Sequence, residues 1–165
     1  MEIDPTGVVA PAGSDGIVIR GVDAPSELAT VHRVLVEAFA EDWGYHPLAL
    51  ERWVEEHAGG PNHDPSLWGL AFDGAEPVAA LTATLTEGRG WVDELGVRPS
   101  WRGRGIAAAL LRRSFATFSD RGVRRVILNV DAENPTGATR LYERVGMRIA
   151  TRWDLWERVR GDGAA

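Results

Sequence analysis

The chain has 165 residues, of which 44% are hydrophobic and 25% charged, the size and composition of one globular domain. It contains no cysteine, which excludes a disulfide, a thiolate metal site and a cysteine nucleophile. A net charge of −6 argues against nucleic-acid binding, and no signal peptide or membrane-spanning run is evident, so we expect a cytoplasmic protein that binds neither nucleic acid nor membrane.

Hydrophobic periodicity predicts the following elements in chain order. Residues 1–16 are expected to be a flexible leader, residues 17–159 one domain, and residues 160–165 a disordered tail. Ser26 is the expected N-cap of the first helix. The order strand, two helices, three strands, helix, strand, helix, strand implies an α/β domain with a mixed sheet covered by helices. The predicted elements span residues 17–22, 26–39, 47–57, 66–72, 78–86, 91–97, 106–120, 126–130, 136–145 and 149–159.

The most informative segment is a glycine-rich turn, residues 102–107, that leads from a strand directly into a helix. The first turn of a helix leaves backbone N–H groups without partners and carries the positive end of the helix dipole. Gly103 and Gly105 let an anion approach the backbone, and Arg102 and Arg104 add positive charge. The segment therefore predicts a pyrophosphate site, with a ligand-free tight turn as the alternative.

Two other phosphate loops do not match. The chain has no G-x-x-x-x-G-K-[ST] and no lysine, and it has no complete G-x-G-x-x-G with a following acidic residue. The turn instead resembles the R/Q-x-x-G-x-G/A loop of the GNAT family of N-acetyltransferases, with Ala107 in the last position and Leu95-x-Val97-x-Pro99 before it. The segment DAENPTGATRLYERVGM, together with FAEDWGY nearer the start, is similar to the mycothiol-synthase-like branch of that family.

The resemblance implies a single GNAT-type domain whose mixed, mostly antiparallel sheet is splayed between the fourth and fifth strands and flanked by helices. It also implies acetyl-CoA as co-substrate and no metal. The loop backbone would hold the pyrophosphate, and the preceding strand end would pair with the pantetheine arm. The implied cofactor-binding residues are Leu95, Gly96, Val97, Arg102, Gly103, Arg104, Gly105, Ile106, Ala107, Ala108, Asn134 and Tyr142.

A second signature lies further along the chain. The residues Asn134, Ala138, Leu141, Tyr142, Gly146 and Met147 resemble the family pattern N-x-x-A-x-x-L-Y-x-x-x-G-F, with one extra residue after the asparagine and Met in place of the final Phe. The resemblance implies that Asn134 donates to the pantetheine arm and that Tyr142 protonates the departing thiolate as general acid. From the residues alone, a helix cap and a core tyrosine are the alternatives.

The proton acceptor is less clearly marked. Many family members carry a glutamate on the fourth strand, but Trp91 stands at that position. Strand alternation predicts that Asp93 shares a face with Trp91, Leu95 and Val97, and that Glu94 points to the other face. Asp93 is therefore the first candidate base and Glu94 the second, and either is alternatively a solvated strand residue.

Aromatic side chains beside carboxylates would suit a cationic amine as acceptor, although core packing equally explains the tryptophans. The histidines show no metal-ligand spacing, so surface or packing roles are expected for His32, His46, His57 and His63. The expected acceptor-binding residues are Phe39, Glu41, Asp42, Trp43, Tyr45, Trp91 and Trp153.

The leading hypothesis is an enzyme, monomer or homodimer, that transfers an acetyl group from acetyl-CoA to a primary amine of a small molecule or a peptide N-terminus by direct attack. A non-catalytic acyl-CoA sensor of the same fold is the main alternative, favoured by Trp91 at the usual base position. A nucleotide-binding protein is the third, and the incomplete phosphate motifs count against it.

Overall fold

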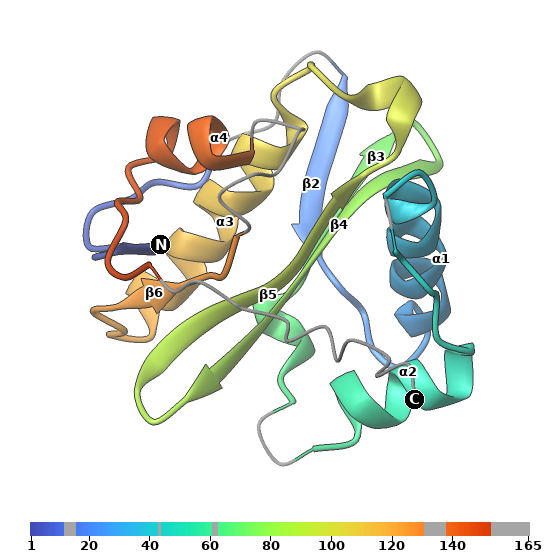
Figure 1. The fold of residues 1–165 in the computed structure, drawn as a ribbon, viewed down its shortest axis with the longest axis horizontal. Coiled ribbons are helices and arrows are strands. Elements are labelled where there is room, and N and C mark those ends of the chain that lie inside the picture. The colour runs from blue at the N-terminus through green and yellow to red at the C-terminus, as the bar shows by residue number, and fades with distance from the viewer. Residues whose placement is uncertain (12–15, 43, 61–62, 131–137, 153–165) are drawn as a thin grey trace, which may run out of the picture.

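A six-stranded sheet with the strand order β1-β6-β5-β4-β3-β2 runs through the centre of the molecule (Figure 1). The computed structural model describes residues 1–11, 16–42, 44–60, 63–130 and 138–152. β6 runs parallel to β5, and the other neighbouring strands pair antiparallel, so the sheet is mixed and mostly antiparallel as expected. The strands are β1 Glu2–Ile3, β2 Ile17–Gly21, β3 Gly69–Asp73, β4 Glu76–Thr86, β5 Arg89–Val97 and β6 Val126–Ile127.

Helices cover both faces of the sheet. α1 (Leu28–Phe39) and α2 (Leu50–Ala58) lie on one side, and α3 (Ile106–Asp120) and α4 (Ala138–Arg144) on the other (Figure 1). Two glycines of β5 mark these sides, because a Cβ added to each would lie 2.8 Å from a helix side chain. At Gly96 that neighbour is Ala38 of α1, and at Gly90 it is Phe118 of α3. Both helices therefore pack directly onto the backbone of β5.

The helices largely follow the predicted pattern. α3 has the expected bounds, and the apolar face of α1 is buried through Leu28, Val31 and Leu35. The prediction of Ser26 as N-cap is wrong. The N-cap residue is Glu27, and the Ser26 hydroxyl instead donates to the carbonyl of Asp23 at 2.8 Å.

The first residues of the chain belong to the sheet, which corrects the expectation of a flexible leader from residue 1. β1 pairs with β6, and the Met1 side chain is buried. The Met1 nitrogen donates to the Leu128 carbonyl at 2.7 Å, and the Leu128 N–H donates to the Met1 carbonyl at 3.0 Å. A two-residue strand has too little periodicity to stand out in a sequence rich in Gly, Pro and Ala. The outer limits of the domain remain a prediction.

Two predicted strands are shorter than expected. The strand predicted at residues 66–72 begins with a 3-10 turn, Pro65–Leu67, because the Asp64 carboxylate accepts from the Ser66 N–H and caps that turn. The strand predicted at 126–130 ends at Ile127, where pairing with β5 stops. Of the strand predicted at 149–159, residues 149–152 are not in a strand, and the rest lies outside the described residues. Within the described ranges, no helix has both the length and the apolar character needed to cross a bilayer.

Candidate functional site

The sheet opens along one edge of β5. β6 pairs with β5 at Gly90 and Trp91, whereas β5 continues to Val97. The next N–H along the chain, that of Arg98, donates across to the Val78 carbonyl of β4 at 3.0 Å. Because backbone groups alternate in direction along a strand, those of Leu95 and Val97 point away from β4. The end of β5 thus presents backbone donors and acceptors to the opening, as the predicted splay requires.

The loop that follows β5 exposes its backbone. A 3-10 turn, Pro99–Trp101, leads into Gly103 and Gly105, which both have φ of +77° in the left-handed region. No described atom lies within 4 Å of a Cβ placed on either glycine. The α3 ladder starts with the Ala109 N–H donating to the Gly105 carbonyl at 3.1 Å, which leaves the N–H groups of the preceding turn directed out of the helix end. This helix start fits an anion such as a diphosphate.

Both loop arginines have partners within the protein. Arg102 donates to the carbonyls of Val97 at 3.2 Å and Ala38 at 2.7 Å, and lies 3.5 Å from the Glu41 carboxylate. Arg104 pairs with Asp73 at 3.1 Å. These contacts tie the loop to the end of α1 and to β3, and they balance part of the positive charge that the sequence assigned to the loop.

A β-bulge interrupts β5 at Asp93. The register pairs Glu94 with Thr82 and Val92 with Ala83, so Asp93 has no opposite residue on β4. The Glu94 N–H instead donates to the hydroxyl of the buried Thr82 at 3.1 Å. A bulge of this kind turns the strand and changes which side chains share a face.

The bulge overturns the predicted alternation. Before it, Gly90 faces α3, and after it, Gly96 faces α1, although both positions are even. The prediction that Asp93 shares a face with Trp91 is confirmed. Thr84 pairs with Trp91 across the strands, and its hydroxyl donates to the Asp93 carboxylate at 3.4 Å. The predicted placement of Leu95 and Val97 on that face is wrong, as is that of Glu94 on the opposite face. Asp93 and Glu94, adjacent in sequence, both project to the side of α1 and α2.

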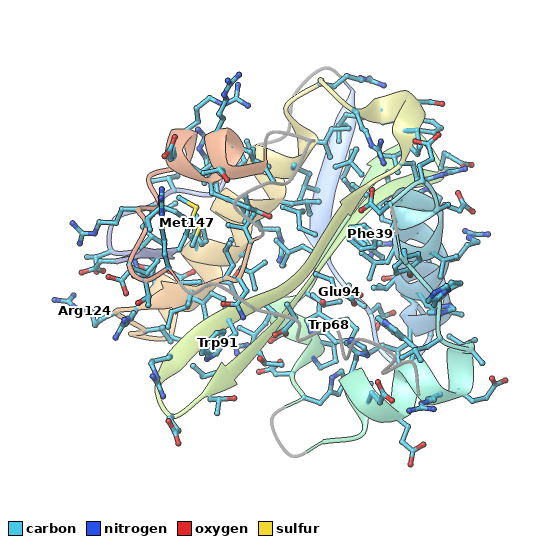
Figure 2. The ribbon with its side chains drawn as sticks, in the orientation of Figure 1. Phe39, Trp68, Trp91, Glu94, Arg124 and Met147 are labelled. Carbon is cyan, nitrogen blue, oxygen red and sulfur yellow. The ribbon has the colours of Figure 1, made fainter. Side chains whose placement is uncertain are left out.

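Glu94 lies against α2. Its Oε2 accepts from Trp53 Nε1 at 3.3 Å and lies 3.5 Å from Nε2 of His57. The Trp53 and His57 rings are stacked with centroids 4.7 Å apart. Figure 2 shows Glu94 on the side of the sheet that faces α1 and α2. The Trp53 indole also meets that of Trp68 edge-on at 5.7 Å. The carboxylate is therefore held in an aromatic setting that is still partly open, with 23% of the Glu94 side chain exposed.

Asp93 differs from Glu94 in its surroundings. Its side chain is at the surface, but enough protein surrounds the carboxyl group that desolvation raises its pKa above the ordinary value. The hydrogen bond from Thr84 and the charge of His57 lower that pKa, and the charge of Glu94 raises it further. The effect of both neighbours places Asp93, Glu94 and His57 in one electrostatic cluster.

Tyr142 projects from α4, which packs against α3 on the far side of the sheet from α2. Its ring packs against the hydrophobic core, and burial raises the pKa of its hydroxyl. A phenol that stays protonated suits a proton donor. Asn134 lies outside the described residues, so its contact with the pantetheine arm remains a prediction.

The expected acceptor residues are only partly brought together. Phe39 and Tyr45 meet at 5.5 Å, and burial followed by the negative charge of Glu94 raises the pKa of Tyr45. Trp91 shares the face of Asp93, whereas Glu41 and Asp42 are exposed and Glu41 is directed to Arg102. Trp43 and Trp153 lie outside the described residues.

Sequence reasoning missed Trp53 and His57. Both lie on α2 and face a residue on β5 about forty positions later, as the indole bond from Trp53 to Glu94 shows. No local motif links the two segments, and a histidine without metal-ligand spacing gave no signal of its own.

Comparisons with known proteins agree with this arrangement. The profile of the acetyltransferase (GNAT) family matches residues 28–147. The mycothiol acetyltransferase of Streptomyces scabiei (strain 87.22) is 31% identical over 150 residues, covering 88% of this chain and 46% of that protein.

Solved structures give the same result. A GCN5-related N-acetyltransferase from Sphaerobacter thermophilus superposes with a TM-score of 0.78 at 39% identity, covering 89% of this chain and 46% of that one. The chain thus spans about half the length of this protein and of the Streptomyces relative. The ribosomal-protein-S18-alanine N-acetyltransferase of Escherichia coli has a TM-score of 0.66 at 19% identity over 82% of this chain and 79% of that one, a likeness of fold alone.

Proposed function

Since this chain belongs to the GNAT family of acetyltransferases, we propose that it transfers an acetyl group from acetyl-CoA to a primary amine. The acceptor is a small molecule or a peptide N-terminus, and the amine attacks the thioester directly. The main support is the start of α3. There, two glycines with positive φ leave the backbone accessible, next to the end of β5 that β6 does not pair with.

The α3 end and the β5 edge supply the contacts that the co-substrate needs. Backbone N–H groups from Gly103 to Ala108 hold the diphosphate, because they point out of the helix start and a negative charge there is favoured by the helix dipole. The backbone groups of Leu95 and Val97 pair with the pantetheine arm in place of a neighbouring strand. Arg102 already donates to the Val97 carbonyl at 3.2 Å. The groups left for the arm are therefore the Val97 N–H and the N–H and carbonyl of Leu95.

Proton transfer is divided between the two sides of the sheet. When bound, acetyl-CoA supplies an activated carbonyl for the amine to attack. Tyr142, on the α3 and α4 side, is kept protonated by burial and donates to the departing sulfur. Asp93 and Glu94, turned together to the α2 side by the bulge, accept the proton that the amine loses.

The same face favours a cationic acceptor. Two carboxylates, the aromatic rings of Trp53 and Trp91, and the Tyr45 phenol lie on the side of α1 and α2. Carboxylates attract an ammonium group, and aromatic rings accommodate both its charge and the apolar part of its carrier. The presence of Trp91 at the usual glutamate position therefore does not leave this face without a base.

The test is release of CoA thiol from acetyl-CoA with a panel of amines that includes diamines, amino sugars and short peptides. Thiol release that depends on one class of amine, together with the mass of an acetylated product, supports the proposal. Saturable CoA binding without turnover on any amine would instead indicate a sensor, and binding of ATP or NAD without CoA would indicate a nucleotide-binding protein.

A further inference from the structure

His57 of α2 is held in one orientation by its own helix. Its Nδ1 lies 2.9 Å from the Trp53 carbonyl oxygen, and its ring stacks on the Trp53 indole. A carbonyl oxygen only accepts, so Nδ1 must carry a proton. In the neutral ring Nε2 therefore carries the lone pair, and this is the nitrogen that lies 3.5 Å from Oε2 of Glu94.

We propose that His57 is a relay residue whose Nε2 receives the proton that Glu94 removes from the amine, which returns Glu94 to its carboxylate form beside the acceptor. This inference rests on the proposed function. The separation of 3.5 Å is longer than a hydrogen bond, and catalytic hydrogen bonds commonly shorten only when substrates are bound.

The proton balance is complete. As the amine nitrogen forms its bond to the acetyl carbon, the bond from that carbon to sulfur breaks and the sulfur takes the proton of Tyr142. The amine proton passes to Glu94 and then to Nε2, which leaves Glu94 as a carboxylate and His57 as an imidazolium. The His57 side chain is 26% exposed, so the imidazolium returns its proton to water, from which Tyr142 is reprotonated.

The charged and titratable groups around His57 favour this route. From β5 it faces Glu94 directly, and the charge of His57 also acts on Asp93. The loop between α1 and α2 contributes Tyr45, whose pKa is raised by burial and then by the negative charge of Glu94. The ring of His32 of α1 also lies 5.4 Å from that of Trp53, but its Nε2 is directed to the Leu48 carbonyl at 2.9 Å. Among the described neighbours, the charged groups that act on His57 are thus the carboxylates of Glu94 and Asp93.

Two variants separate proton transfer from packing. His57→Phe keeps an aromatic ring against Trp53 but has no nitrogen. His57→Ala opens a partly exposed space that admits either imidazole or pyrazole, two rings of one size of which only imidazole is a good base. His32→Phe is the matched control, because it alters a histidine on the same tryptophan that contacts no described carboxylate.

We expect His57→Phe and His57→Ala to lower kcat at least about tenfold, with the amine KM and the acetyl-CoA Kd within about twofold of the wild type. Imidazole should restore the activity of His57→Ala and pyrazole should not, while His32→Phe keeps wild-type kcat. Wild-type kcat in His57→Phe, or the same degree of rescue by the two azoles, including none, would overturn the proposal.

A second readout does not depend on turnover. Ring ¹⁵N spectra should show neutral His57 with its proton on Nδ1 and neutral His32 with its proton on Nε2, because each donates to a carbonyl through that nitrogen. Glu94→Gln should change the Nε2 signal of His57 and leave His32 unaltered. A neutral His57 protonated on Nε2 contradicts the inference. If the wild-type chain acetylates no amine, the proposed function fails, and the spectra still decide the geometry.

Discussion

Replacing Gly105 by alanine should weaken CoA binding far more than it weakens the fold. Gly105 is the N-cap residue of α3 with φ of +77°, and a Cβ there meets no described atom within 4 Å. The cost to stability is therefore the left-handed backbone alone, about 1 kcal/mol, which lowers Tm by about 2–4 °C in a chain of this size. The added methyl group occupies the space through which a diphosphate reaches the backbone. Losing one charge-assisted hydrogen bond costs about 1.5–3 kcal/mol, so Kd should rise about 10- to 100-fold.

Gly122 supplies the matched control. It follows the other end of α3 with φ of +73° and is equally open, so Gly122→Ala carries the same backbone strain without approaching the loop. Thermal unfolding and calorimetric titration with CoA should show similar Tm losses for both variants but weak binding in Gly105→Ala alone. Equal CoA affinity in the two variants would refute the assignment of the loop.

Three further predictions concern protons. Tyr142→Phe should lower kcat by about 100-fold or more and weaken CoA binding much less, measured by steady-state kinetics and calorimetry. An unaltered kcat would remove its role as acid. Desolvation raises the pKa of Asp93, so its ionisation lowers the free energy of unfolding at neutral pH. Asp93→Asn should therefore be more stable than wild type in urea titrations at neutral pH and equal to it below about pH 3. A constant difference over this pH range would contradict the prediction. Arg20, at 2.6 Å, holds the pKa of Glu27 at about 2, so this pair stabilises the fold above pH 4.5 and the contribution is lost as the pH falls through about 2. Glu27→Gln should therefore lower the free energy of unfolding by about 1 kcal/mol at pH 7, a value reduced for solvent screening at the half-exposed Arg20. Near pH 2 the substitution should have almost no effect. An equal loss at both pH values would exclude the ion pair as its source.

Local signals in the sequence were sufficient for most of the fold and for the position of the glycine-rich turn before α3. The turn at residues 102–107 and the apolar period of α3 are contiguous, so their placement follows from chain geometry. The edge left open by β6 followed from the family resemblance, and it is present because pairing with β5 stops at Trp91.

The acceptor side could not be predicted in the same way. Simple alternation placed Asp93 and Glu94 on opposite faces, and the bulge that brings them together depends on the Thr82 hydroxyl of β4 taking the Glu94 N–H. The approach of His57 to Glu94 joins a helix and a strand that share no motif. Both features arise from tertiary packing, for which a single sequence gives no pairing information.

Titration of the ¹⁵N-labelled chain with CoA, followed through its amide resonances, will show whether backbone N–H groups at the start of α3 hold the diphosphate. Large, saturable shifts at Gly103 to Ala108, with smaller ones at Leu95 and Val97, are the predicted result. Saturation that leaves these amides unmoved, or no saturation at millimolar CoA, would contradict the account.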